Sequence, residues 1–449
     1  MESAIEAEQS AEHAAKRPIR KDGPYAWFVL SVFMLAYMVS FIDRQLLTLL
    51  VGPIRATLHI SDFQLSLLHG FAFAMFYTVL GMPIGRLVDR SRRTTVIAIG
   101  ITVWSIMTAL CGLARSFGQL FLARVGVGVG EAALSPGAYS MLSDCFSAHQ
   151  LPRALSFYNG AANVGAGFAI MAGGALIALM PAVTLPGIGM LEPWQAVFIA
   201  VGLPGVLVAL LVLALREPPR TGLKSSFGGE QPRIGEVFAY LAERRAAFGT
   251  LMIGYAVAGL VWNGSLAWLP TFFMRIHGWS VGDVAWRYGL AIIGAGSVGV
   301  IIGSQISIML RARGHEDANI KIGLLSLGGV LPFGLASVLV QSDTVSILLV
   351  FVFFTFCSFP FGSAAAALQE ITPNQMRGQV AAIYLFCLSF FGMGLGPAIV
   401  ANFTDNVFGY DGALGYSLAI TIAIVVPIAA FLLWRACGHY RAALARNDF

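Results

Sequence analysis

Charged residues are scarce in this sequence of 449 residues, where they make up only 11% of the total. Soluble domains usually carry about 25% charged residues. Hydrophobic residues make up 57%, so the surrounding solvent is expected to be lipid. Within lipid, only helices and closed barrels pair all their backbone groups. The apolar runs are about twenty residues long and do not alternate with polar residues, so they predict transmembrane helices and not a barrel.

Cysteine is also sparse. The five cysteines are odd in number and lack metal-type spacing, so they predict neither a disulfide framework nor a metal site. The run 294–299 matches the glycine fingerprint of dinucleotide sites, but it lies inside an apolar span, where helix packing explains it better. No other nucleophile or phosphate-loop motif stands out. We therefore expect that the protein is not an enzyme and that it binds neither a cofactor nor a metal.

Twelve apolar runs lie along the chain, near 26–50, 64–85, 95–113, 118–142, 154–180, 194–215, 248–274, 286–310, 321–340, 345–369, 379–402 and 412–434. They predict an all-α membrane protein in which six transmembrane helices, a charged linker and six more transmembrane helices follow one another. The expected divisions are an N-terminal tail at 1–25, a first bundle at 26–215, a linker at 216–247, a second bundle at 248–434 and a C-terminal tail at 435–449. The polar first residues contain no apolar signal region, so we interpret them as a cytoplasmic tail.

Lysine and arginine predict the orientation in the membrane. If the N-terminus is inside, 22 of the 28 basic residues fall on the cytoplasmic side. Such an excess places both termini in the cytoplasm. The same distribution accounts for the net charge of +5 without nucleic acid as a partner. We expect a monomer in the inner (plasma) membrane of a bacterium, in contact with membrane lipids.

Four charged side chains lie well inside the predicted spans. They are Asp43 and Arg44 in the first span, and Arg124 and Glu131 in the fourth. A charge at the bilayer centre costs at least ~2.5 kcal/mol, so such residues are rarely incidental. Arg124 and Glu131 are about 10 Å apart along one helix face. The two pairs can meet around one cavity, with Asp43 or Glu131 facing Arg124.

Two interpretations of these charges stay open. Carboxylates inside membranes often relay protons, which predicts a coupling role for Asp43 and Glu131. Arg124 stays charged and can bind an anionic group or, without substrate, a carboxylate. Arg44 points about a quarter turn from Asp43 and is an equal candidate for a structural partner. The alternative is an ion-pair network that only fixes the first and fourth helices together.

A second cluster follows the second span. It combines Gly85, Asp89, Arg90 and Arg93. Asp89 can cap a helix end or pair with an arginine, and the basic residues can anchor at the inner membrane surface. We interpret the cluster as an inner gate, an interpretation that is compatible with a simpler role in topology and loop capping.

The second half carries no charge well inside its spans. Its candidate polar lining includes Trp262 and Asn263, beside dense aromatics at 353–361. A cavity with one charged wall and one apolar wall suits an amphiphilic molecule.

These motifs carry a resemblance to a known family. The layout and the loop from Gly85 to Arg93 resemble the major facilitator superfamily, although the usual glycine is missing near Arg92. Residues 41–44, 89–93, 104–105, 124–132, 143–144 and 153 are similar to the spinster branch, which transports sphingolipids and lysophospholipids. The resemblance implies two six-helix bundles, a central cavity and alternating access. It also implies proton coupling by Asp43 and Glu131, with Arg124 as their partner.

We therefore predict a proton-coupled secondary transporter of an amphiphilic or lipid-like substrate. One alternative is a major facilitator transporter of a small organic or sugar acid, because aromatic-acid and sugar-acid transporters share an Asp-Arg pair in the first helix. The other is a non-transporting sensor on the same scaffold. A sensor would be expected to carry a larger soluble output domain than the linker at 216–247 provides.

Overall fold

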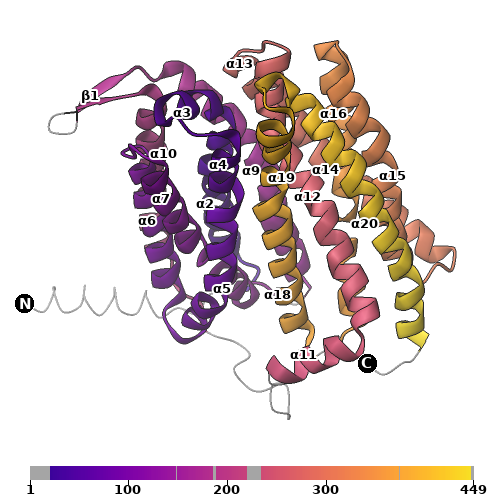
Figure 1. Cartoon of the computed structure of the whole chain (residues 1–449). Helices are drawn as coiled ribbons and strands as arrows, with labels where there is room; N and C mark the ends of the chain where they lie inside the picture. Colours follow the sequence, from indigo (N-terminus) through magenta and orange to yellow (C-terminus); the bar gives the residue numbers. More distant parts are fainter. Residues whose placement is uncertain (1–20, 148, 186–188, 220–233, 374, 446–449) are drawn as a thin grey trace, which may run out of the picture.

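The protein is a helical bundle (Figure 1). Its structure, a computed structural model, describes residues 21–147, 149–185, 189–219, 234–373 and 375–445. Twelve of the described helical segments are long and apolar enough to cross a membrane, which confirms the predicted number. Figure 1 shows the first six on one side of the molecule and the last six on the other.

The N-terminal half contains six spans and a hairpin. Its elements are α2 (Pro24–Leu49), α3 (Val51–Leu58), α4 (Asp62–Ser66), the π-helical η1 (Leu67–Phe71), α5 (Ala72–Arg90), α6 (Arg93–Cys111), α7 (Phe117–Glu131), α8 (Leu134–Cys145), α9 (Leu151–Leu179), β1 (Val183–Leu185), β2 (Gly189–Leu191) and α10 (Pro193–Leu213). Helix 2 of the bundle is formed by α4, η1 and α5, and helix 4 by α7 and α8. The two strands pair antiparallel, with Val183 opposite Leu191.

The linker and C-terminal half follow the same plan. Their elements are α11 (Ile234–Glu243), α12 (Arg245–Ile276), α13 (Val281–Asp283), η2 (Val284–Tyr288), α14 (Gly289–Ala312), α15 (Ala318–Leu339), α16 (Asp343–Ser358), the 3-10 turn η3 (Phe359–Phe361), α17 (Ser363–Glu370), α18 (Arg377–Cys387), η4 (Leu388–Leu395), α19 (Gly396–Asn402), η5 (Phe403–Phe408), the 3-10 turn η6 (Asp411–Ala413) and α20 (Leu414–Ala445). Helix 11 of the bundle runs from α18 to η5.

The last helix is longer than its apolar run. We expected a tail from residue 435, whereas α20 continues to Ala445. The added turns pack on the C-terminal half, because Tyr440 is buried and donates a hydrogen bond to Glu370. These last turns are polar and do not extend the apolar run, so the hydropathy pattern predicted a helix that ends too early, at residue 434. The hairpin β1–β2 was also not predicted, because its strands are only three residues long.

Small residues let neighbouring helices approach closely. A Cβ atom at Gly130 would lie 2.5 Å from the backbone nitrogen of Trp104 and 2.6 Å from the carbonyl oxygen of Gly100, so α6 and α7 could not pack as they do. Glycine has the same role between the halves, where a Cβ at Gly70 would lie 2.1 Å from the carbonyl oxygen of Met393. Lipid supplies no hydrophobic drive for helix association, so this close van der Waals packing stabilises the bundle.

The two ends of the bundle differ. We call the end that carries α3, α13 and β1 the outer end, and the opposite end, where α2 starts and α20 stops, the inner end (Figure 1). The distribution of lysine and arginine predicts that the inner end lies in the cytoplasm. We expect peptide tags at both chain ends to resist protease in sealed right-side-out vesicles and to be cut in inverted vesicles. A tag that is cut from the outside of right-side-out vesicles would contradict this topology.

Candidate functional site

The four intramembrane charges form two ion pairs, one buried and one partly buried. Arg124 of α7 donates to Asp43 of α2 at 2.9 Å, and Arg44 of α2 donates to Glu131 of α7. Thr108 of α6 adds a hydrogen bond of 3.2 Å to Asp43. We refer to Asp43, Arg44, Arg124 and Glu131 as the charged quartet. The sequence left open which carboxylate faces Arg124, and the structure assigns Asp43 to it.

Arg44 is the most accessible member of the charged quartet. Its side chain is 17% exposed, whereas Glu131 is 2% exposed. Its guanidinium carbon lies 4.3 Å from the ring centroid of Phe73 and 5.0 Å from that of Phe41. Aromatic faces attract cations, so they hold this guanidinium in place while it faces Glu131.

The charged quartet has spare hydrogen-bonding capacity. Among the described residues, Oδ1 of Asp43, Oε1 of Glu131, and the Nε atoms of Arg44 and Arg124 are buried without a hydrogen-bond partner. Buried polar atoms are normally paired, so exceptions call for an explanation such as a functional role or a bound molecule. The site can therefore accept further donors or an anionic group without dismantling both ion pairs.

Tyrosine rings lie around the same helices. Tyr37 of α2 stacks on Tyr158 of α9 with ring centroids 4.9 Å apart, and Tyr139 of α8 lies 5.5 Å from Tyr158. The hydroxyl of Tyr139 donates to Asn159 at 2.6 Å. Tyr77 lies 5.9 Å from the Arg44 guanidinium. Such rings combine apolar faces with polar tips, a surface suited to an amphiphilic molecule.

Trp262 and Asn263 of α12 are half-buried and belong to the opposite half. Trp262 packs against Phe354 and Phe361 at 5.0 and 5.3 Å between ring centroids. Asn263 donates to the carbonyl of Gly259 in its own helix at 2.9 Å. The described contacts join neither residue to the charged quartet, so their predicted role in substrate binding stays a prediction.

The predicted inner gate lies at the end of α5 and the start of α6. A Cβ at Gly85 would meet open space, and Arg90 is exposed. The side chain of Asp89 lies outside the described part of the structure. Arg93, by contrast, is 1% exposed and bonds to Asp144 at 2.5 Å and to Glu217 at 2.9 Å. Arg93 thus joins α6 to α8 and to the segment that follows α10.

We expect Arg93→Ala to lower the free energy of unfolding by about 3–5 kcal/mol, because the buried carboxylate of Asp144 would lose its counter-charge. We also expect it, like Asp89→Asn, to slow turnover more than it weakens substrate binding, since both residues lie at the inner end. Arg92→Ala is the matched control, because Arg92 is exposed. Thermal unfolding and transport rates would be compared in one detergent and one vesicle preparation. Equal turnover in Asp89→Asn and the parent would leave the loop with a topological role only.

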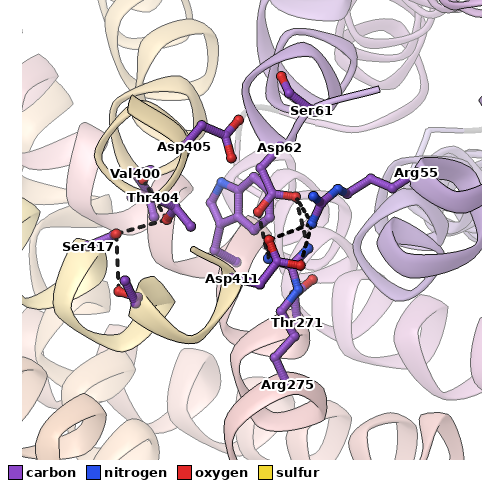
Figure 2. A network of polar contacts seen from close by, with 12 residues as sticks. Arg55, Ser61, Asp62, Thr271, Arg275, Val400, Thr404, Asp405, Asp411 and Ser417 are labelled. Carbon is purple, nitrogen blue, oxygen red and sulfur yellow. Dashed lines mark hydrogen bonds and ion pairs between the residues drawn. The ribbon is translucent and has the colours of Figure 1, made fainter. Parts of the chain in front are cut away.

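A cluster of ion pairs joins the two halves at the outer end (Figure 2). Arg275 of α12 donates to both oxygens of Asp62 in α4, at 2.6 and 2.9 Å. Arg55 of α3 donates to both oxygens of Asp411, at 2.9 and 3.0 Å, and lies 3.1 Å from Asp62. Asp405 accepts the backbone N–H of Phe63 at 2.7 Å. We call Arg55, Asp62, Arg275, Asp405 and Asp411 the outer latch.

Packing agrees with closure at the outer end. A Cβ at Gly174 of α9 would lie 2.2 Å from Ala285 of the other half, and one at Gly167 would lie 2.6 Å from the carbonyl of Gly289. Toward the inner end, a Cβ at Gly160 or at Gly378 would meet open space. The close glycine contacts of α9 with the other half therefore lie toward the outer end, beside the ion pairs of the outer latch.

Sequence reasoning missed several site residues. His69 is half-buried in the π-helical turn η1, and its Nε2 has no hydrogen-bond partner among the described residues. A single histidine in an apolar run gives no strong sequence signal, whereas the π-helical turn that holds it is a feature that often marks functional sites. The outer latch was missed because Asp62 and Asp411 lie outside or at the edge of the predicted spans, and distant loops give no pairing signal. Among the described residues, no cluster of His, Cys, Asp or Glu fits a metal ion.

Comparison with known proteins shows which family this chain resembles. A sequence model of the Major Facilitator Superfamily matches residues 33–397. An MFS-type efflux pump of Mycolicibacterium smegmatis is 26% identical over 98% of each chain. A probable L-galactonate transporter of Escherichia coli is 22% identical over 86% of this chain and 85% of its own. The crystal structure of a bacterial homologue of the human lysosomal transporter Spinster, inward-facing and unoccupied, is 28% identical with a TM-score of 0.78, over 94% of this chain and 98% of that one.

Proposed function

Because the chain belongs to the Major Facilitator Superfamily, we propose that it is a proton-coupled secondary transporter of an amphiphilic, lipid-like anion. Alternating access, the working principle of this superfamily, accounts for ion pairs that join the two halves at the outer end, because such pairs can break when that end opens. The observation that carries the proposal is the charged quartet, whose carboxylates lie inside the membrane and each face one arginine. Intramembrane carboxylates with such partners are typical of proton relays.

In the proposed mechanism, Glu131 and an anionic substrate compete for Arg44. When Glu131 is ionised, it holds the guanidinium of Arg44 by an ion pair. When Glu131 takes up a proton, that pair weakens, and Arg44 becomes free to bind an anionic head group. Proton uptake and anion binding therefore favour each other, which couples the two in thermodynamic terms. Asp43 and Arg124 form the second, more deeply buried pair and hold α2 against α7 during the exchange.

The proposed substrate is amphiphilic because the surroundings of Arg44 are aromatic. Phe41, Phe73 and Tyr77 surround its guanidinium, and the stacked rings of Tyr37 and Tyr158 continue this apolar surface. An anionic head at Arg44 would place an attached chain along these rings. The resemblance of the sequence to the spinster branch, a family of sphingolipid and lysophospholipid transporters, supports the same class.

A second candidate is a small sugar acid, favoured by the likeness to the probable L-galactonate transporter. A sugar acid would also bind Arg44 through its carboxylate. It would need several hydrogen bonds for its hydroxyls, since buried polar groups must be paired. The hydroxyls of the tyrosines and the amide of Asn159 are the available partners.

Native mass spectrometry and transport assays would separate the two candidates. We expect the purified protein to retain lysophospholipid and to transport a fluorescent lysophospholipid in proteoliposomes, but not radiolabelled galactonate. Arg44→Gln should weaken retention roughly ten- to 150-fold, the range for losing a charge-assisted hydrogen bond. Arg287→Gln is the matched control, since Arg287 is 49% exposed at the outer end. Transport of galactonate alone would refute the amphiphile and favour the sugar acid.

A further inference from the structure

An apolar pocket of about 660 Å³ lies on the seam between the two halves, near the outer latch. Leu67, Phe71 and Phe121 line it from the N-terminal half, and Leu395, Ile399 and Phe403 line it from the C-terminal half. Nine of its ten lining residues are apolar, and Asn402 is the exception. We call this space the seam pocket. None of the charged quartet lines it.

The position of the seam pocket indicates its occupant. All its lining residues belong to helical segments that are long and apolar enough to cross a membrane, and its lining is apolar, so we infer that it faces lipid. Water or a polar solute would lose hydrogen bonds there, because the lining offers one amide only. That amide is exposed, and Oδ1 of Asn402 accepts a hydrogen bond from Asn406 at 2.8 Å. A polar pair beside an apolar pocket fits a lipid whose chain enters the pocket while its head stays outside.

We propose that the seam pocket binds one alkyl chain of a membrane lipid, and that the bound chain favours the state in which the outer end is closed. The two sides of the pocket belong to opposite halves, so a chain inside it contacts both halves at once. The outer latch adjoins it, since Phe63 lines the pocket and donates its backbone N–H to Asp405. Opening the outer end moves the two sides apart and removes these shared contacts.

The energy of this binding comes from packing. A chain that moves from lipid to protein gains no hydrophobic free energy, so its affinity depends on van der Waals contact in a confined space. A ligand shifts an equilibrium only by its differential affinity for the two states. A pocket shared between the halves supplies that difference, because the packing exists only while the halves are together.

Photolabelling in lipid nanodiscs tests the proposal. The probe is phosphatidylcholine with a diazirine in the middle of one acyl chain, and labelled peptides are mapped by mass spectrometry. We expect labelling of helices 2, 4 and 11 at the seam pocket. Ile399→Trp and Leu67→Trp fill it from opposite sides and should each lower that labelling about tenfold. Leu122→Trp is the matched control, because Leu122 is 69% exposed on helix 4 beside Phe121.

A second comparison tests the link to the closed state. Asp62→Asn weakens the outer latch without touching the seam pocket, so it should also lower the labelling, while Asp283→Asn at the same end should not. Thermal unfolding would show that each variant is folded. Labelling that is equal in Ile399→Trp, Leu67→Trp and Leu122→Trp would overturn the lipid site. Labelling that Asp62→Asn leaves unchanged would overturn its preference for the closed state. Protein–protein cross-links at the same peptides would assign the pocket to a second copy of the chain and overturn the proposal.

Discussion

Glu131→Gln is expected to abolish proton-driven accumulation of the substrate while the protein stays folded. A gradient of one pH unit stores about 1.4 kcal/mol per proton, which supports roughly tenfold accumulation. Glutamine keeps the shape of Glu131 and can still accept a hydrogen bond from Arg44, but it cannot release a proton. The accumulation ratio should therefore fall to about one. We expect Asp43→Asn to have the same effect, because Arg124 would lose the carboxylate that holds α2 against α7 during the exchange. The measurement is uptake of fluorescent lysophospholipid into proteoliposomes with an imposed pH gradient.

Glu192→Gln is the matched control for this experiment. Glu192 lies at the outer end, where it caps α10 in a capping box, and a glutamine side chain can make similar bonds. Thermal unfolding separates coupling from bracing, because breaking a buried ion pair costs about 3–5 kcal/mol. If Glu131→Gln and Asp43→Asn unfold at lower temperature but accumulate substrate as the parent does, the two carboxylates only brace the helices.

Asp62→Asn is expected to shift the protein strongly toward an outward-open state. Asp62 is fully buried and receives two hydrogen bonds from Arg275, with Arg55 at 3.1 Å. Without the negative charge of Asp62, the positive charges of Arg55 and Arg275 repel each other more strongly. A loss of about 2–3 kcal/mol would raise the ratio of outward-open to outward-closed protein roughly 30- to 160-fold.

Cysteine labelling from the outside would measure this shift. Thr271 is 2% exposed and donates to the carbonyl oxygen of Thr48 across the seam at 3.4 Å. A Thr271→Cys reporter should react with a membrane-impermeant maleimide much faster in Asp62→Asn than in the parent. Asp283→Asn is the control, since Asp283 pairs with Arg287 within the C-terminal half. Equal labelling rates in Asp62→Asn and Asp283→Asn would show that the outer latch does not hold the halves together.

The spans could be predicted from the sequence because lipid leaves a simple pattern. Apolar runs such as 26–50 and 194–215 lie within two residues of α2 and α10 at each end. The pattern fails where a helix leaves the hydrocarbon, as α20 does beyond residue 434. It also fails for β1 and β2, because strands of three residues are too short to show an alternating pattern.

The charged quartet could be found from the sequence because a charge inside a span is costly and therefore rare. Which charges pair could not be found, since rotation and tilt of α2 against α7 depend on packing around residues such as Gly130. The ion pairs of the outer latch could not be predicted from the sequence at all. Its members are charged residues near the ends of spans, where charge is common and carries no information about partners.

The composition of the charged quartet has an electrical consequence. Two carboxylates and two guanidinium groups sum to zero formal charge, so the empty site crosses the membrane field without electrical work. Each uncompensated charge would cost about 2.3 kcal/mol per 100 mV. Under the proposed coupling of one proton to one monovalent anion, the loaded site is also neutral. Both half-cycles would then be indifferent to the membrane potential, and transport would draw on the pH difference alone.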